Sequence, residues 1–244
     1  MKHVEVAHGN SKLEAVVHMP GKPDIRTVFI MCHGFRGSRD GGGRAVLLAD
    51  EIAGMGFSVV RFNFTPLQSL SAQVEEIGAI VKYCQDHIGG RIILLGRSMG
   101  GSAAAVYASK AKNISGLCLW ATPWNLTETF QLALGDGYKR LEKGQTLAIN
   151  DDFGHLQLTK AFIDDFKKID LPEYLRKLDQ IPVLVLHGSQ DEIVGLDQAE
   201  YVYQILQQPK EFKVISGGNH QLAEHSQEAS MAVRGWLRRQ FMTD

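Results

Sequence analysis

Several features that mark special classes of protein are missing from this 244-residue sequence. Cysteine is scarce: Cys32, Cys84 and Cys118 are odd in number and lie in apolar runs, which favours free thiols over a disulfide framework. Nowhere do roughly 18 apolar residues run together as a membrane span requires. The first residues contain no apolar signal core, so we expect a cytoplasmic protein that does not enter the membrane.

An excess of charge of one sign is also missing. The 26 Lys and Arg residues nearly balance the 27 Asp and Glu residues, and the formal net charge is −1. This balance gives no electrostatic reason to expect nucleic acid or an anionic membrane as a partner. The sequence leaves the oligomeric state open.

Motifs for metals and nucleotides are absent as well. There is no cluster of Cys and His and no His-Glu-x-x-His segment, so we expect no metal. The glycine-rich stretch at residues 37–43 lacks the Gly-Lys-Ser or Gly-Lys-Thr of a phosphate loop, and we interpret it as a mobile loop near a cleft. We therefore expect no cofactor.

What the chain does contain is an alternation of short apolar runs and amphipathic segments. After a predicted strand pair at residues 4–8 and 13–19, buried strands are predicted at 25–32, 57–64, 91–95, 114–120, 183–187 and 212–215. Helices are predicted at 44–54, 68–88, 99–111, 196–207 and 221–241. Since parallel neighbours need helical crossovers, this order predicts an α/β domain with a mainly parallel sheet and helices on both faces.

One interval, residues 123–169, interrupts the alternation. It has no buried-strand run but is rich in aromatic residues and glycine, and residues 146–150 and 155–159 are typical of the two arms of a hairpin. We interpret it as a cap insertion, with residues 1–122 and 170–244 forming the core. Its aromatic side chains, including Trp124, Phe130 and Phe153, either contact a substrate or form the mini-core of the cap.

The sharpest local signal is Gly96-Arg97-Ser98-Met99-Gly100, which follows an apolar strand and opens a helix of small residues. A serine at a sharp turn between strand and helix adopts a strained backbone, and glycines two residues away leave space for the turn. The hydroxyl is then directed into the cleft at the carboxyl ends of the strands. We interpret Ser98 as a nucleophile rather than as part of an ordinary tight turn.

A serine nucleophile needs a base, and the base needs a carboxylate. His220 follows the last predicted strand in a glycine-rich loop, whereas His225 should lie a turn or more inside the final helix and His187 is more typical of a packed strand end. Asp191 follows the strand at 183–187 and is the preferred acid, with Glu192 as the alternative. Ser98, Asp191 and His220 should meet at one edge of the sheet.

Acyl transfer also needs donors for an oxyanion. The backbone amide of Met99 follows the nucleophile at the start of a helix, and that of Phe35 follows His33-Gly34 at the end of an early strand. The Gly34-Phe35 pair could equally form an ordinary turn, but its coincidence with the other elements favours an oxyanion loop. We expect His33 and Gly34 to lie beside the substrate.

Together these residues resemble the α/β-hydrolase superfamily: His33-Gly34-Phe35, the Ser98 motif, then Asp191 and His220 in the order expected of that fold. The chain is most similar to small bacterial esterases of the cinnamoyl/feruloyl type, which carry a His-Gly-Phe loop, a cap at this position and a Val-Leu-x-x-His-Gly-x-x-Asp segment. It departs from them in lacking a Gly-His-Gly-x-Ser turn after residues 61–66. It also has Arg97 and Met99 where those enzymes more often have His and Gln.

The resemblance implies a serine hydrolase that acts on a small-molecule carboxylic ester through an acyl-enzyme. A thioesterase or an acyl-peptide or amide hydrolase would use the same residues, and a protein that binds without turnover could retain the same fold.

Overall fold

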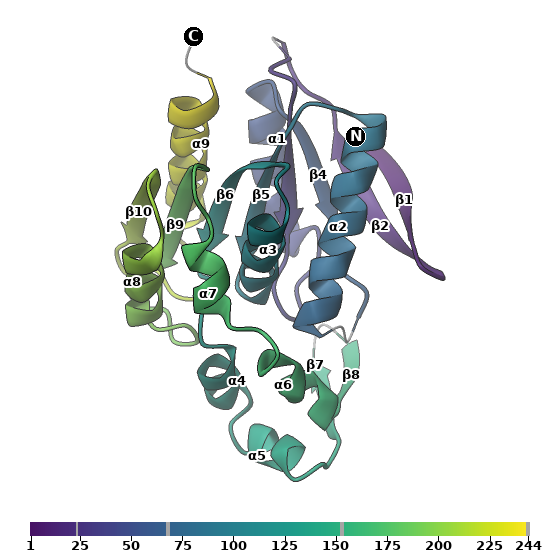
Figure 1. Ribbon diagram of the computed structural model, residues 1–244, viewed down its shortest axis with the longest axis vertical. Helices are drawn as coiled ribbons and strands as arrows, with labels where there is room; N and C mark the ends of the chain where they lie inside the picture. Colours follow the sequence, from purple (N-terminus) through teal and green to yellow (C-terminus); the bar gives the residue numbers. More distant parts are fainter. Residues whose placement is uncertain (23, 67–68, 152–153, 243–244) are drawn as a thin grey trace.

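The computed structural model of the protein describes residues 1–22, 24–66, 69–151 and 154–242, in which an eight-stranded sheet forms the centre (Figure 1). Its spatial order is β1-β2-β4-β3-β5-β6-β9-β10, and from β4 onward all neighbours are parallel. β1 and β2 add an antiparallel edge. The strands are β1 (Lys2–His8), β2 (Ser11–His18), β3 (Thr27–Cys32), β4 (Ser58–Phe62), β5 (Arg91–Arg97), β6 (Ile114–Trp120), β9 (Val183–Gly188) and β10 (Lys210–Ile215).

Helices cover both faces of this sheet (Figure 1). α1 (Arg44–Gly54) and α9 (Ser226–Phe241) pack on one face, and α2 (Leu70–His87), α3 (Met99–Lys110) and α8 (Leu196–Ile205) pack on the other. The predicted α/β architecture with a mainly parallel sheet is confirmed. Within the described ranges, no helix combines the length and the apolar character needed to cross a lipid bilayer.

The central strands are apolar throughout because both of their faces are buried. In β3 every residue is buried, and successive side chains alternate between the two helical layers. Val28 and Ile30 belong to the core on the α2 and α3 side, whereas Phe29 and Met31 belong to the core on the α1 and α9 side. A strand that supplies two cores cannot alternate apolar with polar residues, which is why these runs stand out in the sequence.

A largely helical segment separates β6 from β9 and lies at the end of the sheet where β6 finishes (Figure 1). It contains α4 (Leu126–Leu134), α5 (Asp136–Glu142), the antiparallel strands β7 (Leu147–Asp151) and β8 (Gly154–Leu158), and α6 (Lys160–Phe166), and α7 (Leu171–Arg176) follows it. The predicted hairpin corresponds to β7 and β8, whereas these helices were not predicted. The division into a core and a separate cap stays a prediction.

The start of the last helix differs from the prediction. α9 begins at Ser226 rather than at residue 221, so His225 lies just before the helix and not inside it. The cause is a turn at Asn219, whose side-chain oxygen accepts a hydrogen bond from the Leu222 amide at 2.9 Å. Such a side-chain bond offers the backbone an alternative to the helix. The loop that carries His220 is thereby lengthened.

A buried carboxylate joins the segment after β6 to the helices of the core. Asp165 in α6 is 3% exposed and accepts hydrogen bonds from the backbone amide of Ser71 at 2.8 Å and from its hydroxyl at 2.9 Å. Ser71 lies in the first turn of α2, where backbone amides have no partner within the helix. The carboxylate therefore both caps α2 and anchors α6.

We predict that Asp165→Ala lowers the free energy of unfolding by about 1–3 kcal/mol, because it leaves two half-buried donors of Ser71 without their acceptor. Urea denaturation followed by circular dichroism measures this loss. Asp164→Ala is the matched control, since among the described residues the partly exposed carboxylate of Asp164 pairs with the exposed Lys167 alone, and its removal should change stability little. Equal effects of the two substitutions would contradict the anchoring role.

Candidate active site

Ser98 occupies a strained turn between β5 and α3. Its φ and ψ are 51° and −130°, a left-handed combination that side chains rarely adopt and that costs on the order of 1–3 kcal/mol. Two backbone hydrogen bonds hold the turn: the Ser98 amide donates to the Trp120 carbonyl at 2.9 Å, and the Gly101 amide donates to the Ser98 carbonyl at 2.8 Å. The serine is therefore fixed at the carboxyl edge of the sheet.

The glycines of the motif allow backbone to pack directly on backbone. A Cβ at Gly96 would come within 2.4 Å of the Gly101 Cα, and one at Gly100 within 2.2 Å of the His33 carbonyl oxygen. Side chains at these positions would push α3 away from β5 and from the end of β3. The spacing of glycine around Ser98 is thus a packing requirement.

The loop after β3 lies against Ser98. A Cβ at Gly34 would be 2.9 Å from the Ser98 Cβ, so the two residues are in contact. His33 fixes this loop: its Nε2 accepts a hydrogen bond from the Phe64 amide at 3.1 Å, which leaves the proton on Nδ1 to donate to the Gly34 carbonyl at 2.8 Å. Burial lowers the pKa of His33, which keeps the ring in this neutral form.

Two backbone amides border the serine. Phe35 follows Gly34 in the loop, and Met99 is the first residue of α3, where the N–H groups carry the positive end of the helix dipole. Among the hydrogen bonds of the described residues, neither of these two amides acts as a donor. Their role as donors to an oxyanion stays a prediction.

A buried histidine and carboxylate pair lies at the ends of the neighbouring strands. His220 Nδ1 is 3.0 and 2.8 Å from the two carboxylate oxygens of Asp191. Burial alone would raise the pKa of Asp191, but hydrogen bonding to His187 and His220 outweighs burial and holds the pKa well below its usual range. The amides of Ile193 and Val194 also donate to this carboxylate, at 3.0 and 2.8 Å. Asp191 is therefore an ionised acceptor.

The loop of His220 is held on both sides. Glu192 accepts a hydrogen bond from the His220 amide at 3.1 Å, so Asp191 contacts the ring while Glu192 binds the main chain. From the other side, the Arg97 guanidinium donates to the His220 carbonyl at 3.0 Å and to the Gln221 side chain at 2.9 Å. The residue before Ser98 thereby ties the serine turn to the loop of His220.

Solved structures resemble this arrangement over nearly the whole chain. Est1E from Butyrivibrio proteoclasticus, solved with bound ferulic acid, is 18% identical with a TM-score of 0.81, and the match covers 98% of this chain and 100% of that one. The esterase domain of a Rhodothermus marinus protein is 18% identical, covers 98% of each chain and has a TM-score of 0.74. XC6422 from Xanthomonas campestris, described as an α/β serine hydrolase without lid, is 16% identical over 100% of this chain and 96% of that one, with a TM-score of 0.71.

The protein has the α/β-hydrolase fold. The profile of the PhoPQ-activated pathogenicity-related protein family matches residues 149–242, which is less than half of the chain. No curated protein sequence matches significantly.

Within the α/β-hydrolase fold, Ser98, Asp191 and His220 follow β5, β9 and β10 at the same edge of the sheet. Asp191 and the ring of His220 are in contact. In the described part of the chain, no hydrogen bond joins the Ser98 hydroxyl to that ring. The operation of the three residues as one triad stays a prediction.

The residues predicted to touch a substrate have different surroundings. His33 and Gly34 line a cleft of about 640 Å³ between the loop after β3, the end of β4 and β8. Phe130 is 3% exposed and its ring packs on those of Phe162 and Phe166, which favours the mini-core interpretation. Trp124 packs on Tyr201 with 4.7 Å between ring centroids. Phe153 lies outside the described residues.

Three contributions to this site were not predicted from the sequence. Arg97 was noted only as a departure from the esterases, His33 as a neighbour of the substrate, and His187 as a packed strand end. His187 is fully buried, and its Nε2 lies 2.7 Å from the Val194 carbonyl and 3.3 Å from Asp191. The His-Gly pair before Asp191 is the signal that could have indicated this role.

Among the described residues, no group of acidic, His and Cys side chains is arranged to hold a metal.

We predict that Gly100→Ala destabilises the protein by about 1–3 kcal/mol, because the new methyl group would collide with the His33 carbonyl and displace the first turn of α3. Urea denaturation measures the change. Gly54→Ala is the matched control, since a Cβ at this helical position meets open space and should leave stability unchanged or raise it. A Gly100→Ala protein as stable as wild type would show that the close packing is not required.

We also predict a characteristic pH dependence for Asp191→Asn. A carboxylate with a lowered pKa contributes stability that is fully present above its unfolded value of about 4 and is lost as the pH falls toward the folded value. The stability difference between wild type and Asp191→Asn should thus be constant from about pH 7 to 5 and shrink only below about pH 4. Urea denaturation at each pH tests this, and a difference that is already lost at pH 5 would contradict the lowered pKa.

Proposed function

We propose that this protein is a serine hydrolase that cleaves carboxylic esters, with Ser98 as nucleophile, His220 as base and Asp191 as the partner of the base. The observation that carries this proposal is the strained backbone of Ser98 at the same sheet edge as the buried pair of His220 and Asp191. A strained serine between strand and helix is the geometry that exposes a hydroxyl to a substrate.

In the first half of the proposed reaction, the Ser98 hydroxyl oxygen attacks the ester carbonyl carbon while Nε2 of His220 takes the hydroxyl proton. The carbonyl electrons move onto oxygen, and the amides of Phe35 and Met99 donate hydrogen bonds to this oxyanion. The intermediate collapses by breaking the bond to the alcohol oxygen, which receives the proton from His220. The acyl group remains on Ser98.

In the second half, water attacks the acyl-enzyme carbonyl and gives one proton to His220, and the bond to the serine oxygen breaks as that oxygen regains the proton. Asp191 accepts a hydrogen bond from Nδ1 of His220 throughout, which fixes the tautomer with a free Nε2 and stabilises the cationic ring. The carboxylic acid product then leaves. These steps use only residues of this chain.

The substrates that fit this proposal are esters with a small or aryl acyl group. The cleft of about 640 Å³ reaches Gly34, which contacts Ser98, and its apolar wall includes Phe64 and Leu156. Its volume lies within the usual range for small-molecule sites. The bound ferulic acid of Est1E offers an aryl acid as precedent within the same fold.

We predict that Ser98→Ala lowers the rate of p-nitrophenyl ester hydrolysis by roughly a thousandfold or more and abolishes labelling by a fluorophosphonate probe. Ser109→Ala is the matched control, because Ser109 lies at the far end of α3 and its loss should leave both measurements unchanged. Labelling that survives Ser98→Ala would contradict the assignment of the nucleophile. A wild-type protein that neither hydrolyses esters nor reacts with the probe would indicate a binding protein of the same fold.

A separate experiment compares esters, thioesters and amides as substrates. The same machinery could act on thioesters or on acyl-peptide and amide bonds, whose leaving groups are different. Measuring kcat/KM for p-nitrophenyl esters of increasing acyl length, for acyl-CoA and for aminoacyl amides separates these classes. We expect the highest value for short-chain or aryl esters, and a higher value for acyl-CoA would replace the ester proposal with a thioesterase.

A further inference from the structure

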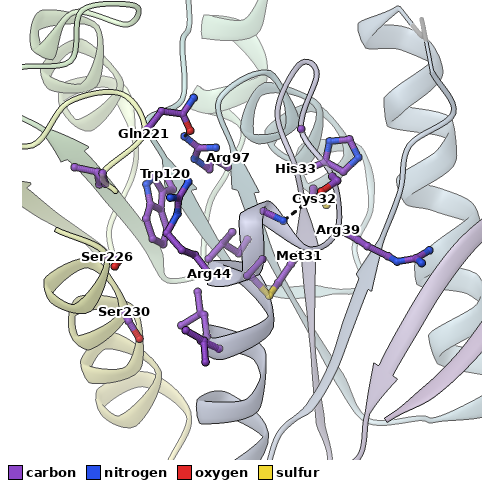
Figure 2. Close-up of a pocket in the computed structure, with 18 of the residues that line it drawn as sticks. Met31, Cys32, His33, Arg39, Arg44, Arg97, Trp120, Gln221, Ser226 and Ser230 are labelled. Carbon is purple, nitrogen blue, oxygen red and sulfur yellow. Dashed lines mark hydrogen bonds between the residues drawn. The ribbon is translucent and has the colours of Figure 1, made fainter. Parts of the chain in front are cut away.

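A second cavity lies between α1, α9 and the ends of β3, β5 and β6 (Figure 2). Its volume is about 380 Å³. Neither Ser98 nor His220 lines it, although their neighbours Arg97 and Gln221 do. The cavity is therefore adjacent to the candidate active site but does not include the candidate nucleophile or base.

Two arginine side chains, Arg44 and Arg97, lie at one side of this cavity. Figure 2 shows Arg44, Arg97 and Trp120 grouped together. Arg44 is the first residue of α1 and is half-buried, and its side chain forms no hydrogen bond or ion pair with any described residue. Burial, and after it the nearby positive charge of Arg44, lower the pKa of Arg97 to about 10.

The acidic side chain in the wall does not neutralise these cations. Glu51 lines the cavity about two helical turns after Arg44. Its carboxylate is already engaged, since it accepts a hydrogen bond from the Ser230 hydroxyl and lies 3.4 Å from Arg234 Nε. The side of the cavity near Arg44 thus has an excess of positive charge.

A buried donor without an acceptor adjoins the same cations. The indole N–H of Trp120 is buried, and no acceptor for it exists among the described residues. A buried N–H group left unpaired costs about 1–3 kcal/mol, so an oxygen atom placed there would be stabilised. Trp120 lines the cavity, and a ligand oxygen would supply the missing acceptor once the indole N–H turns toward it.

Part of the remaining wall is apolar, and Ser226 and Ser230 add hydroxyl groups to it. Met31, Leu48 and Leu95 contribute side chains from β3, α1 and β5. An inorganic ion would leave this surface without contacts, whereas a short hydrocarbon body or a single aromatic ring would cover it. The cavity volume lies at the lower end of the range for small-molecule sites.

We propose that this cavity is a second binding site, specific for a small organic carboxylate with an apolar body. The carboxylate accepts hydrogen bonds from Arg44 and from the Trp120 indole, and the apolar body packs on Leu48 and Leu95. The site does not depend on the proposed ester hydrolysis, because none of the groups that bind the ligand is a proposed catalytic residue.

Isothermal titration calorimetry of the full chain with 4-phenylbutyrate tests this site. We expect saturable binding of 4-phenylbutyrate and at least about tenfold weaker binding of both 4-phenylbutanamide, which lacks the charge, and acetate, which lacks the apolar body. No detectable binding of 4-phenylbutyrate, or equal binding of either comparison ligand, overturns the proposal.

Two variants place the ligand within the cavity. Arg44→Gln should raise the Kd for 4-phenylbutyrate about tenfold or more through loss of a charge-assisted hydrogen bond, and Trp120→Phe should raise it severalfold while keeping an aromatic ring. Arg39→Gln is the matched control: Arg39 also lines the cavity, but its guanidinium donates to Glu14 at 2.7 Å and extends away from Arg44 (Figure 2). Its Kd should remain at the wild-type value.

Two results with these variants would overturn the proposal. Binding that is unchanged in both Arg44→Gln and Trp120→Phe assigns the ligand to another part of the protein, including the cleft beside Gly34, and overturns the proposal. Equal weakening by Arg39→Gln and Arg44→Gln does the same, because it indicates a general effect of surface charge. Circular dichroism of each variant confirms that the comparison is made on folded protein.

Discussion

The arrangement depends on one close contact, in which the first turn of α3 packs on the backbone at the end of β3. Gly100 permits this contact, since even a methyl group would overlap the His33 carbonyl. The contact holds Ser98 in a backbone conformation that would otherwise relax, and the strain of about 1–3 kcal/mol is offset by the packing on both sides of the turn. It also brings Gly34 against Ser98, so the strained serine and the loop with the Phe35 amide are positioned by the same packing.

Hydrogen bonds fix the orientation of the polar groups of the site. His33 is neutral because one ring nitrogen accepts from the backbone and the other donates to it. Asp191 is ionised because backbone amides and ring nitrogens all point toward its oxygens. Arg97 then bridges the serine turn and the carbonyl of His220, a connection that an uncharged residue of shorter reach could not make. Three loops are joined by hydrogen bonds to one sheet edge.

The sequence was sufficient to predict the core because its central strands are buried on both faces. Residues 114–120 and 44–54 were predicted to the residue, as β6 and α1, since apolar periodicity determines both. The helices between β6 and β9 were not predicted, because segments of six to nine residues carry too few turns for a periodic pattern. The predicted start of α9 was wrong because the Leu222 amide donates to the Asn219 side chain and Leu222 has a positive φ of 46°, which a helix does not allow.

For the site, residue types and their order along the chain could be predicted, but not the contacts between loops. The position of Asp191 after a strand favoured it over Glu192, and in the structure it is Asp191 that contacts the His220 ring. Two contacts depend on how two loops approach each other in space. Glu192 binds the backbone of His220, and His187 contacts the carboxylate of Asp191. Local patterns carry no information about such distances.

Phe35 shows how the segment after β6 takes part in the site. Its backbone amide borders Ser98, while its ring lies 5.1 Å from that of Phe130 and 5.4 Å from that of Phe162, both in that segment. Phe162 belongs to α6, which Asp165 anchors to α2. The loop that carries the amide is therefore held from the sheet side by His33 and from the opposite side by this aromatic cluster. Because a residue bound on both sides cannot shift without breaking one set of contacts, the helices of the segment help to fix the position of the Phe35 amide.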